Sequence, residues 1–185
     1  MDPAQSAGPV AEYTSLRLEI DTRAKYQQQI LALQLTLSSA VFGFALSRPQ
    51  LLALLLAIPM SSYLLSGRYA AQREAIRSIS HYIRDSLHPR TPGGLGWVAW
   101  SRQNPRPNRL IDWLIPMLLT FPGAAVLALG WTFALVFYRD GVGVPARIGL
   151  IVVWLAGLFG SAVSAWTFVR IYREARPARS SASRP

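Results

Sequence analysis

Charged and uncharged residues separate into long blocks along this chain. Four stretches contain no Asp, Glu, Lys, Arg or His, and they hold 22, 19, 26 and 22 residues: 26–47, 49–67, 113–138 and 148–169. A helix rises about 1.5 Å per residue, so about 20 residues cross the roughly 30 Å of a hydrocarbon layer. Four such helices in a soluble protein of this length would leave too little polar surface to cover them. The pattern therefore predicts four membrane spans.

Prolines mark the beginnings of the second and third spans. Only residues 47–49 separate the first two spans, which predicts a tight hairpin in which Pro49 starts the second helix. The third span begins with Pro116 and Pro122, and each proline lacks the N–H that a helical hydrogen bond needs. We expect the third helix to be kinked or tilted there.

Small residues recur at four-residue steps in the fourth span. They form two ladders within the segment GLFGSAVSA: Gly157, Ser161 and Ala165 in one, and Gly160 and Ser164 in the other. Small side chains let helices approach closely in a membrane. We expect a tight helix contact on this face, and a similar role for Gly123 and Gly130 in the third span. Whether the contact lies within one subunit or between subunits stays open.

The segment before the first span, EYTSLRLEIDTRAK, predicts a polar helix that continues into the span without a break. Tyr13, Leu16, Ile20 and Ala24 recur at three- and four-residue steps and form an apolar stripe. Opposite charges four residues apart face each other on a helix and stabilise it by roughly 0.3 kcal/mol per pair. The expected pairs are Arg17–Asp21, Glu19–Arg23 and Asp21–Lys25.

A second polar helix is predicted directly after the second span, and Pro89 and Pro92 end it. Its apolar stripe contains Gln72, Ile76, Ile79, Ile83 and Leu87. The short hairpin brings the two polar helices side by side and antiparallel. We expect them to pack on each other through an interface of Tyr13, Leu16, Ile20, Ile76, Ile79, Ile83 and Leu87. The open alternatives are an interface between subunits and a docking site for another protein.

These elements predict an all-α fold, namely a four-helix transmembrane bundle with cytosolic helical extensions of the first and second spans. The expected parts are a disordered N-terminus at 1–10, a first transmembrane hairpin with its extensions at 11–88, a cytosolic or interfacial linker at 89–112, a second transmembrane hairpin at 113–170 and a disordered basic tail at 171–185. Within the linker, we expect residues 95–100 to lie in the headgroup layer, which tryptophan favours.

Lysine and arginine are distributed unequally across the predicted membrane. The N-terminal segment, the whole connection between the second and third spans (68–112) and the chain from Arg170 onward carry 16 of the 19 basic residues, and the opposite side carries Arg48, Arg139 and Arg147. Because basic residues resist translocation, we expect both termini and the linker on the cytosolic side of a bacterial plasma (inner) membrane. Arginines at span ends contact anionic headgroups, which explains the net charge of +10 without a nucleic-acid partner.

Reactive residues are scarce. The spans lack the ionisable side chains that mark proton-coupled transporters and intramembrane metalloproteases. Their hydroxyl and amide groups would either bond within and between helices or line a narrow pore. Outside the spans, His81 and Asp85 lie four residues apart with Glu74 nearby, but two such ligands rarely make a metal site. The chain has no cysteine. We expect no enzyme activity, no metal and no cofactor.

Two motifs resemble a known class of membrane protein. YTSLRLEI precedes the first span and matches a YxxLRxEI pattern at Tyr13, Leu16, Arg17, Glu19 and Ile20. AIRSISHYIRDSL follows the second span with matches at Ile76, Ile79, Tyr82, Ile83 and Arg84. About the first hundred residues thus resemble small uncharacterised four-span integral membrane proteins of actinobacteria, which implies a membrane protein and names no activity. The hairpin with cytosolic helices is also similar in architecture to two-span bacterial defence effectors that open membranes.

Three functions are compatible with these features. The leading expectation is a non-enzymatic homo-oligomeric membrane assembly whose cytosolic helices bind or sense a partner. The alternative is a pore-forming or membrane-disrupting effector or channel. A small-solute transporter is the third, and the absence of charge in the spans counts against it.

Overall fold

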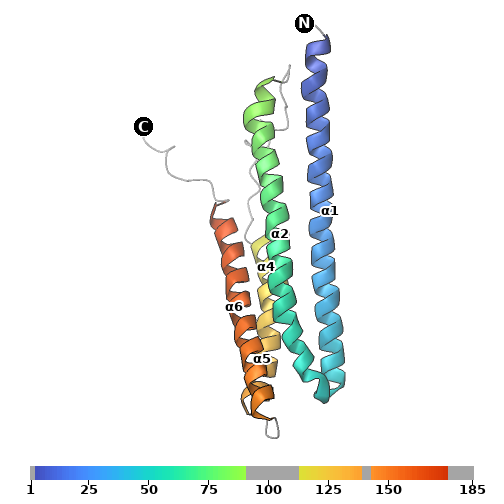
Figure 1. Cartoon of the computed structure of the whole chain (residues 1–185). Helices are drawn as coiled ribbons and strands as arrows, with labels where there is room; N and C mark the ends of the chain where they lie inside the picture. The colour runs from blue at the N-terminus through green and yellow to red at the C-terminus, as the bar shows by residue number, and fades with distance from the viewer. Residues whose placement is uncertain (1–2, 91–112, 139–142, 175–185) are drawn as a thin grey trace, which may run out of the picture. The chain divides into compact units, whose positions relative to one another are not determined.

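The computed structural model describes residues 3–90, 113–138 and 143–174, and the regular elements in these ranges are helical (Figure 1). The elements are α1 (Pro3–Ser47), η1 (Pro49–Leu56), α2 (Ala57–Tyr82), η2 (Ile83–Leu87), η3 (His88–Arg90), α4 (Ile115–Leu118), η5 (Leu119–Gly123), α5 (Ala124–Phe137) and α6 (Val144–Glu174). Of the short elements, η1 and η3 are 3₁₀-helices, and η2 and η5 are π-helical turns.

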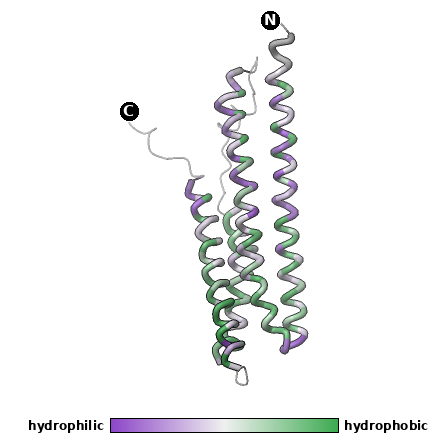
Figure 2. The backbone as a smooth tube through the Cα atoms, viewed as in Figure 1, coloured by the Kyte–Doolittle hydropathy of each residue, from purple (hydrophilic) through white to green (hydrophobic). Residues whose placement is uncertain are grey.

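Four helical segments are long and apolar enough to cross a membrane: Gly8–Ser47, Gln50–Leu87, Ile115–Phe137 and Val144–Glu174. The protein is therefore all-α with four transmembrane helices, as the charge-free stretches predict. Figure 2 shows that α1 changes from polar to hydrophobic along its length and that α2 changes in the reverse order. One helix can pass from water into lipid without a break because its backbone hydrogen bonds are satisfied internally in either medium.

The chain forms two compact units. The first contains Met1–Leu31 and Arg68–Pro107, and we name it the helical pair because α1 and α2 contribute their polar ends to it. The second contains Ala32–Gly67 and Asn108–Pro185, and we name it the membrane unit because it holds most of the charge-free residues. The division falls inside α1 and α2, close to the points where the sequence changes from polar to apolar.

Two helices extend beyond their predicted ends. α1 begins at Pro3, although the sequence predicted disorder at 1–10. Proline is tolerated at the first helical position, where its missing N–H would have no partner, and each residue added to a formed helix gains a hydrogen bond. α6 continues to Glu174, beyond the predicted end at 170, because Glu174 accepts a hydrogen bond from Arg170 Nε at 2.8 Å. Residues 3–10 and 171–174 are thus helical where disorder was predicted.

The first two spans are joined by the predicted hairpin. α1 ends at Ser47, and Arg48 has an extended backbone with φ −138° and ψ 99°. This conformation follows from the sequence, because the residue before a proline is disfavoured in the helical region. Pro49 then begins η1, and the N–H of Leu51 donates to the carbonyl of Arg48 at 2.8 Å. One extended residue therefore makes the reversal.

Pro122 changes the helical geometry at the start of the third span. It cannot donate to the carbonyl four residues back, and the chain forms the π-helical turn η5, after which the Ala124 N–H donates five residues back to Leu119. A Cβ on Gly123 would lie 2.9 Å from the carbonyl oxygen of Leu118. Glycine therefore fits the crowded turn, and the irregularity expected near Pro122 is present.

Apolar clusters hold the membrane unit together. The first joins α1, η1, α2 and α5 through Ala45, Leu55, Ile58 and Ala128. The second joins η1 and α5 through Leu56, Leu129 and Val136, and α6 packs against it. The buried ring of Phe168 in α6 lies 5.5 Å from the ring of Phe121 and 6.0 Å from that of Trp113. Close packing of this kind is what holds helices together in lipid, where the solvent is itself apolar.

Several predicted features lie outside the described residues. These are most of the linker, with its expected interfacial segment at 95–100, and the tail from residue 175 onward.

Candidate functional site

One face of α1 is partly covered along the helical pair. Half-buried residues recur at alternating steps of four and three: Pro9, Tyr13, Leu16, Ile20, Arg23, Gln27 and Ile30. This period of 3.5 residues is typical of a helix that packs lengthwise along a second helix. We name this series the α1 seam. Tyr13, Leu16 and Ile20 lie on it, and Arg23 and Gln27 extend it with polar side chains that the apolar stripe in the sequence did not include.

The apolar stripe of α2 and η2 is covered more completely toward its C-terminal end. Ile76 and Ile79 are half-buried, whereas Ile83 and Leu87 are buried. The α1 seam residues are all half-buried, whereas two of the four residues of α2 and η2 in the predicted interface are buried. The helical pair therefore leaves part of the seam accessible on the α1 side.

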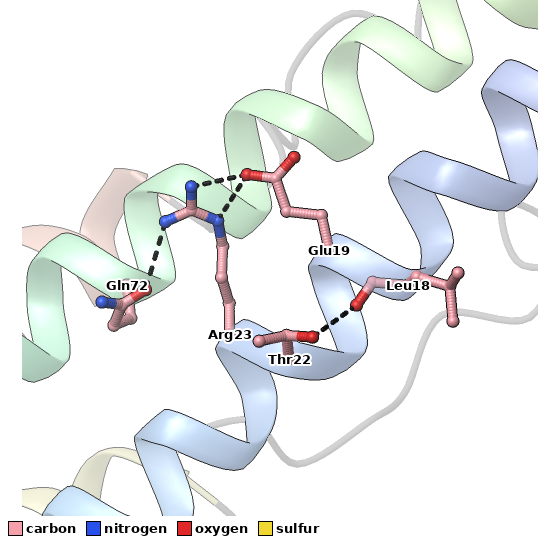
Figure 3. A network of polar contacts seen from close by, with 5 residues as sticks. All are labelled: Leu18, Glu19, Thr22, Arg23 and Gln72. Carbon is pink, nitrogen blue, oxygen red and sulfur yellow. Dashed lines mark hydrogen bonds and ion pairs between the residues drawn. The ribbon is translucent and has the colours of Figure 1, made fainter.

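Hydrogen bonds join the helices of the pair. Tyr82 Oη donates to Glu12 Oε1 at 2.6 Å, and Arg23 Nη1 donates to Gln72 Oε1 at 3.2 Å (Figure 3). Arg23 also lies 2.6 Å from Glu19 Oε1, which is one of the predicted ion pairs. Glu19 thus holds the guanidinium where it reaches Gln72. The two cross-helix bonds lie 11 residues apart on α1 and 10 on α2, so the helices run antiparallel in a nearly constant register.

Asp21 forms one of the two ion pairs that the sequence predicted for it. Lys25 Nζ lies 2.8 Å from Asp21 Oδ2, as predicted. The expected pair of Arg17 with Asp21 does not form, because Asp21 is engaged by Lys25, and Arg17 Nε instead donates to Tyr13 Oη at 2.8 Å. The hydrogen bond from Lys25 to Asp21, and the negative charge of Asp21, raise the pKa of Lys25 above its ordinary 10.5.

A buried polar cluster joins α1 to α2 in the membrane unit. Gln34 is fully buried, and its Nε2 donates to Ser62 Oγ at 2.6 Å and to Ser38 Oγ at 3.1 Å. Its Oε1 has no hydrogen-bond partner among the described residues. Because all three side chains are buried, they bond helix to helix within the chain and do not line an open surface.

Sequence reasoning missed these cross-helix bonds, although a signal for them exists. A hairpin brings together residues that are equally distant from its turn. Gln34 and Ser62 each lie 14 residues from Arg48, and Arg23 and Gln72 lie 25 and 24 residues from it. Counting outward from the turn therefore finds the partners, whereas residue type alone does not.

Two glycines of α6 lie directly against α2. A Cβ on Gly157 would lie 2.8 Å from Pro59 Cβ, and a Cβ on Gly160 would lie 3.1 Å from Tyr63 Cβ. These small residues of the fourth span therefore make a close contact within one chain. Gly130 does not behave in this way, because no described atom lies within 4 Å of the position that its Cβ would take. The expectation of a close contact at Gly130 is corrected accordingly.

The other small residues of the α6 ladders lie on or beside the same face. Ser161 and Ser164 are buried, and Ala165 is half-buried. Ser161 Oγ donates to the carbonyl of Gly157 at 2.7 Å, so this hydroxyl is satisfied by its own helix. The neighbouring contact with α5 is polar, because the indole N–H of Trp154 donates to the carbonyl of Leu129 at 3.0 Å.

Groups that could carry metal chemistry do not gather in the described ranges. Within them, no set of three or more His, Cys, Asp or Glu side chains is placed to hold a metal ion. Asp85 accepts a hydrogen bond from Arg84 Nε at 2.9 Å, and His81 is exposed. We take the α1 seam as the candidate functional surface, because it is incompletely covered and because Arg23 on it bonds across to Gln72.

No protein-family model, curated protein or solved structure matches this chain. Residue chemistry and geometry therefore carry the functional inference.

Proposed function

We propose that the protein is a non-enzymatic homo-oligomeric assembly of a bacterial inner membrane, and that its helical pair lies in the cytosol and binds a partner. The observation that carries the proposal is the incomplete burial of the α1 seam. Tyr13, Leu16 and Ile20 lie on this seam and remain half-exposed.

Two helices alone bury little of each other, and most helical stability in proteins comes from packing of an apolar face. The outer side of α1 also exposes large apolar residues, since Val10, Leu18 and Tyr26 are 51%, 65% and 51% exposed. A third helix laid along one flank of α1 would bury an open edge of the seam together with the exposed apolar side chain on that flank, Val10 on one side or Tyr26 on the other. A second copy of the chain or another cytosolic protein would supply that helix.

The cytosolic orientation rests on charge. The helical pair and the two segments expected on the same side carry 16 basic residues, against three on the other side. Basic residues resist translocation, so this asymmetry favours a cytosolic N-terminus and C-terminus.

A pore-forming assembly is the second candidate, and the exposed hydroxyls of α1 favour it. In the membrane unit, Gln34 and Ser38 are buried, whereas Thr36 and Ser39 are exposed. Hydroxyls on a surface that faces lipid gain nothing from the lipid. In a ring of subunits, Thr36 and Ser39 would face neighbouring copies or a polar lumen.

The native mass of the full chain in lipid nanodiscs tests the proposal. A mass of two or more subunits is expected for a homo-oligomer, and a single-subunit mass would contradict it. A ring of four or more subunits that also passes ions across liposomes would favour the pore. An oligomer that passes no ions would favour the partner-binding assembly, and its partner would be sought by cross-linking from Leu18.

A further inference from the structure

A hollow of about 100 Å³ lies on the C-terminal part of α6. Its lining consists of Trp166, Val169, Arg170, Arg173 and Glu174. These residues are three and four positions apart, so they lie on one side of the helix. The indole of Trp166 is 64% exposed, and the side chain of Arg170 is 70% exposed. The hollow is therefore an accessible surface of the membrane unit.

The hollow extends across the end of the fourth charge-free stretch. Val169 is the last residue of that stretch, and Arg170 is the first charged residue after it. From Trp166 to Arg173 the helix rises about 10 Å. The headgroup and interfacial layer on each side of a bilayer is about 5–8 Å thick. Trp166 therefore reaches the outer hydrocarbon while Arg173 reaches the headgroups, which is the depth at which each residue type is favoured.

The surface of the hollow is almost entirely apolar, and the charged groups at its rim match a phosphate group. Arg170 Nε lies 2.8 Å from Glu174 Oε1, so this arginine already has a carboxylate partner. Arg173 makes no ion pair with any residue that the structure describes. Two arginines and one glutamate leave an excess of one positive charge. A planar guanidinium can bind two oxygens of one phosphate, so Arg173 is the group best suited to receive it.

We propose that this hollow and the arginines at its rim bind an anionic phospholipid. Arg173 takes the phosphate with help from Arg170, and Trp166 and Val169 contact the glycerol and the first methylenes of the acyl chain. A zwitterionic lipid would bring its own positive headgroup charge toward Arg173. The hollow should therefore prefer a lipid with a net negative charge, such as phosphatidylglycerol, over phosphatidylcholine.

The test is native mass spectrometry of the full chain in detergent, titrated with phosphatidylglycerol or with phosphatidylcholine. Each arginine near the lipid phosphate contributes roughly fivefold to binding. The double variant Arg170→Gln/Arg173→Gln should therefore bind phosphatidylglycerol roughly 10- to 30-fold more weakly and phosphatidylcholine unchanged. Glu174→Gln should bind phosphatidylglycerol more tightly than wild type, because it frees Arg170.

The matched control is Arg48→Gln/Arg68→Gln, which removes two exposed arginines at span ends outside the hollow. It should keep nearly wild-type preference for phosphatidylglycerol. An equal loss in both double variants would overturn the proposal, because general attraction to a basic protein would then explain the binding. An unchanged preference in Arg170→Gln/Arg173→Gln would overturn it as well.

Should that variant fail to fold, Glu174→Gln decides alone, since tighter binding supports the hollow and unchanged binding refutes it. Displacement of the lipid by millimolar inorganic phosphate would show that the site prefers a free anion.

Discussion

Replacing Gly157 by alanine should force α6 away from α2. The new Cβ would lie 2.8 Å from Pro59 Cβ, 3.3 Å from Pro59 Cγ and 3.4 Å from Leu129 Cδ2. Carbon atoms in good contact lie about 3.5–4.0 Å apart, so the methyl would be roughly 0.7 Å too close to the proline ring. That ring is tied to the backbone of α2 and cannot rotate away. The two helices must therefore separate.

The cost of this separation can be estimated. A gap of about 0.5–1 Å forfeits a quarter to a half of the dispersion energy of the atoms that lose contact. Inserting a methyl into a packed contact typically costs about 1–3 kcal/mol. Alanine also favours the helix over glycine by up to about 1 kcal/mol, which partly offsets the loss. The raw change for Gly157→Ala therefore mixes two terms.

A matched control separates them. Gly130→Ala adds the same methyl to another helix of the membrane unit where no described atom lies within 4 Å. The stability difference between the two variants isolates the contact with Pro59, and we expect Gly157→Ala to be less stable by about 1–3 kcal/mol. Gly160→Ala should fall between them, because its methyl would lie 3.1 Å from Tyr63 Cβ, a less severe overlap than the 2.8 Å between the Gly157→Ala methyl and Pro59 Cβ.

The assay is reversible unfolding of the purified variants in mixed micelles with rising SDS, followed by circular dichroism. Each variant is compared with wild type at one SDS fraction inside the transition. Equal stabilities of Gly157→Ala and Gly130→Ala would refute the close packing of α6 on α2 through Gly157. A loss for both variants would show that the glycines matter for another reason.

Three other changes test the remaining contacts. Ile20→Asp places a charge on the half-buried α1 seam and should destabilise the helical pair by about 1–2 kcal/mol, whereas Leu18→Asp on the exposed side of α1 should change its stability little. Hydrogen exchange of the α1 amides measures both effects, and equal effects would refute packing through the α1 seam. Gln34→Leu should change stability by less than about 1 kcal/mol, because hydrogen bonds between membrane helices average about 0.6 kcal/mol and the change also removes an unpaired buried oxygen; a loss of several kcal/mol in SDS unfolding would refute this. The raised pKa of Lys25 means that the stabilising contribution of its pair with Asp21 is fully present below about pH 10.5 and is lost as the pH rises through the raised value. This contribution should therefore not vary with pH near neutrality, and thermal unfolding of Lys25→Gln should lack the part of the stability loss above pH 10.5 that this pair causes.

The sequence alone determined the number of spans, their order and the hairpin at Arg48 and Pro49. Membrane insertion depends on the length of an uncharged segment, and that property is read along the chain without knowledge of its partners. The sequence also placed Tyr13, Leu16 and Ile20 on one face of a helix, because helical periodicity is a local property that is read along the chain. The helical ends were less predictable, because adding or removing a residue at the end of a formed helix changes the free energy little.

Only the tertiary structure decided which residues meet. A ladder of small residues allows another helix to approach closely, but it does not specify which helix that is. Gly157 and Gly160 pack against α2, whereas no described atom lies within 4 Å of the Cβ position of Gly130. The cluster at Gln34 likewise depends on the register of α1 against α2, which one inserted residue in the hairpin would shift. Contacts of this kind depend on the packing of complete helices against each other, and the composition of a single helix does not contain that information.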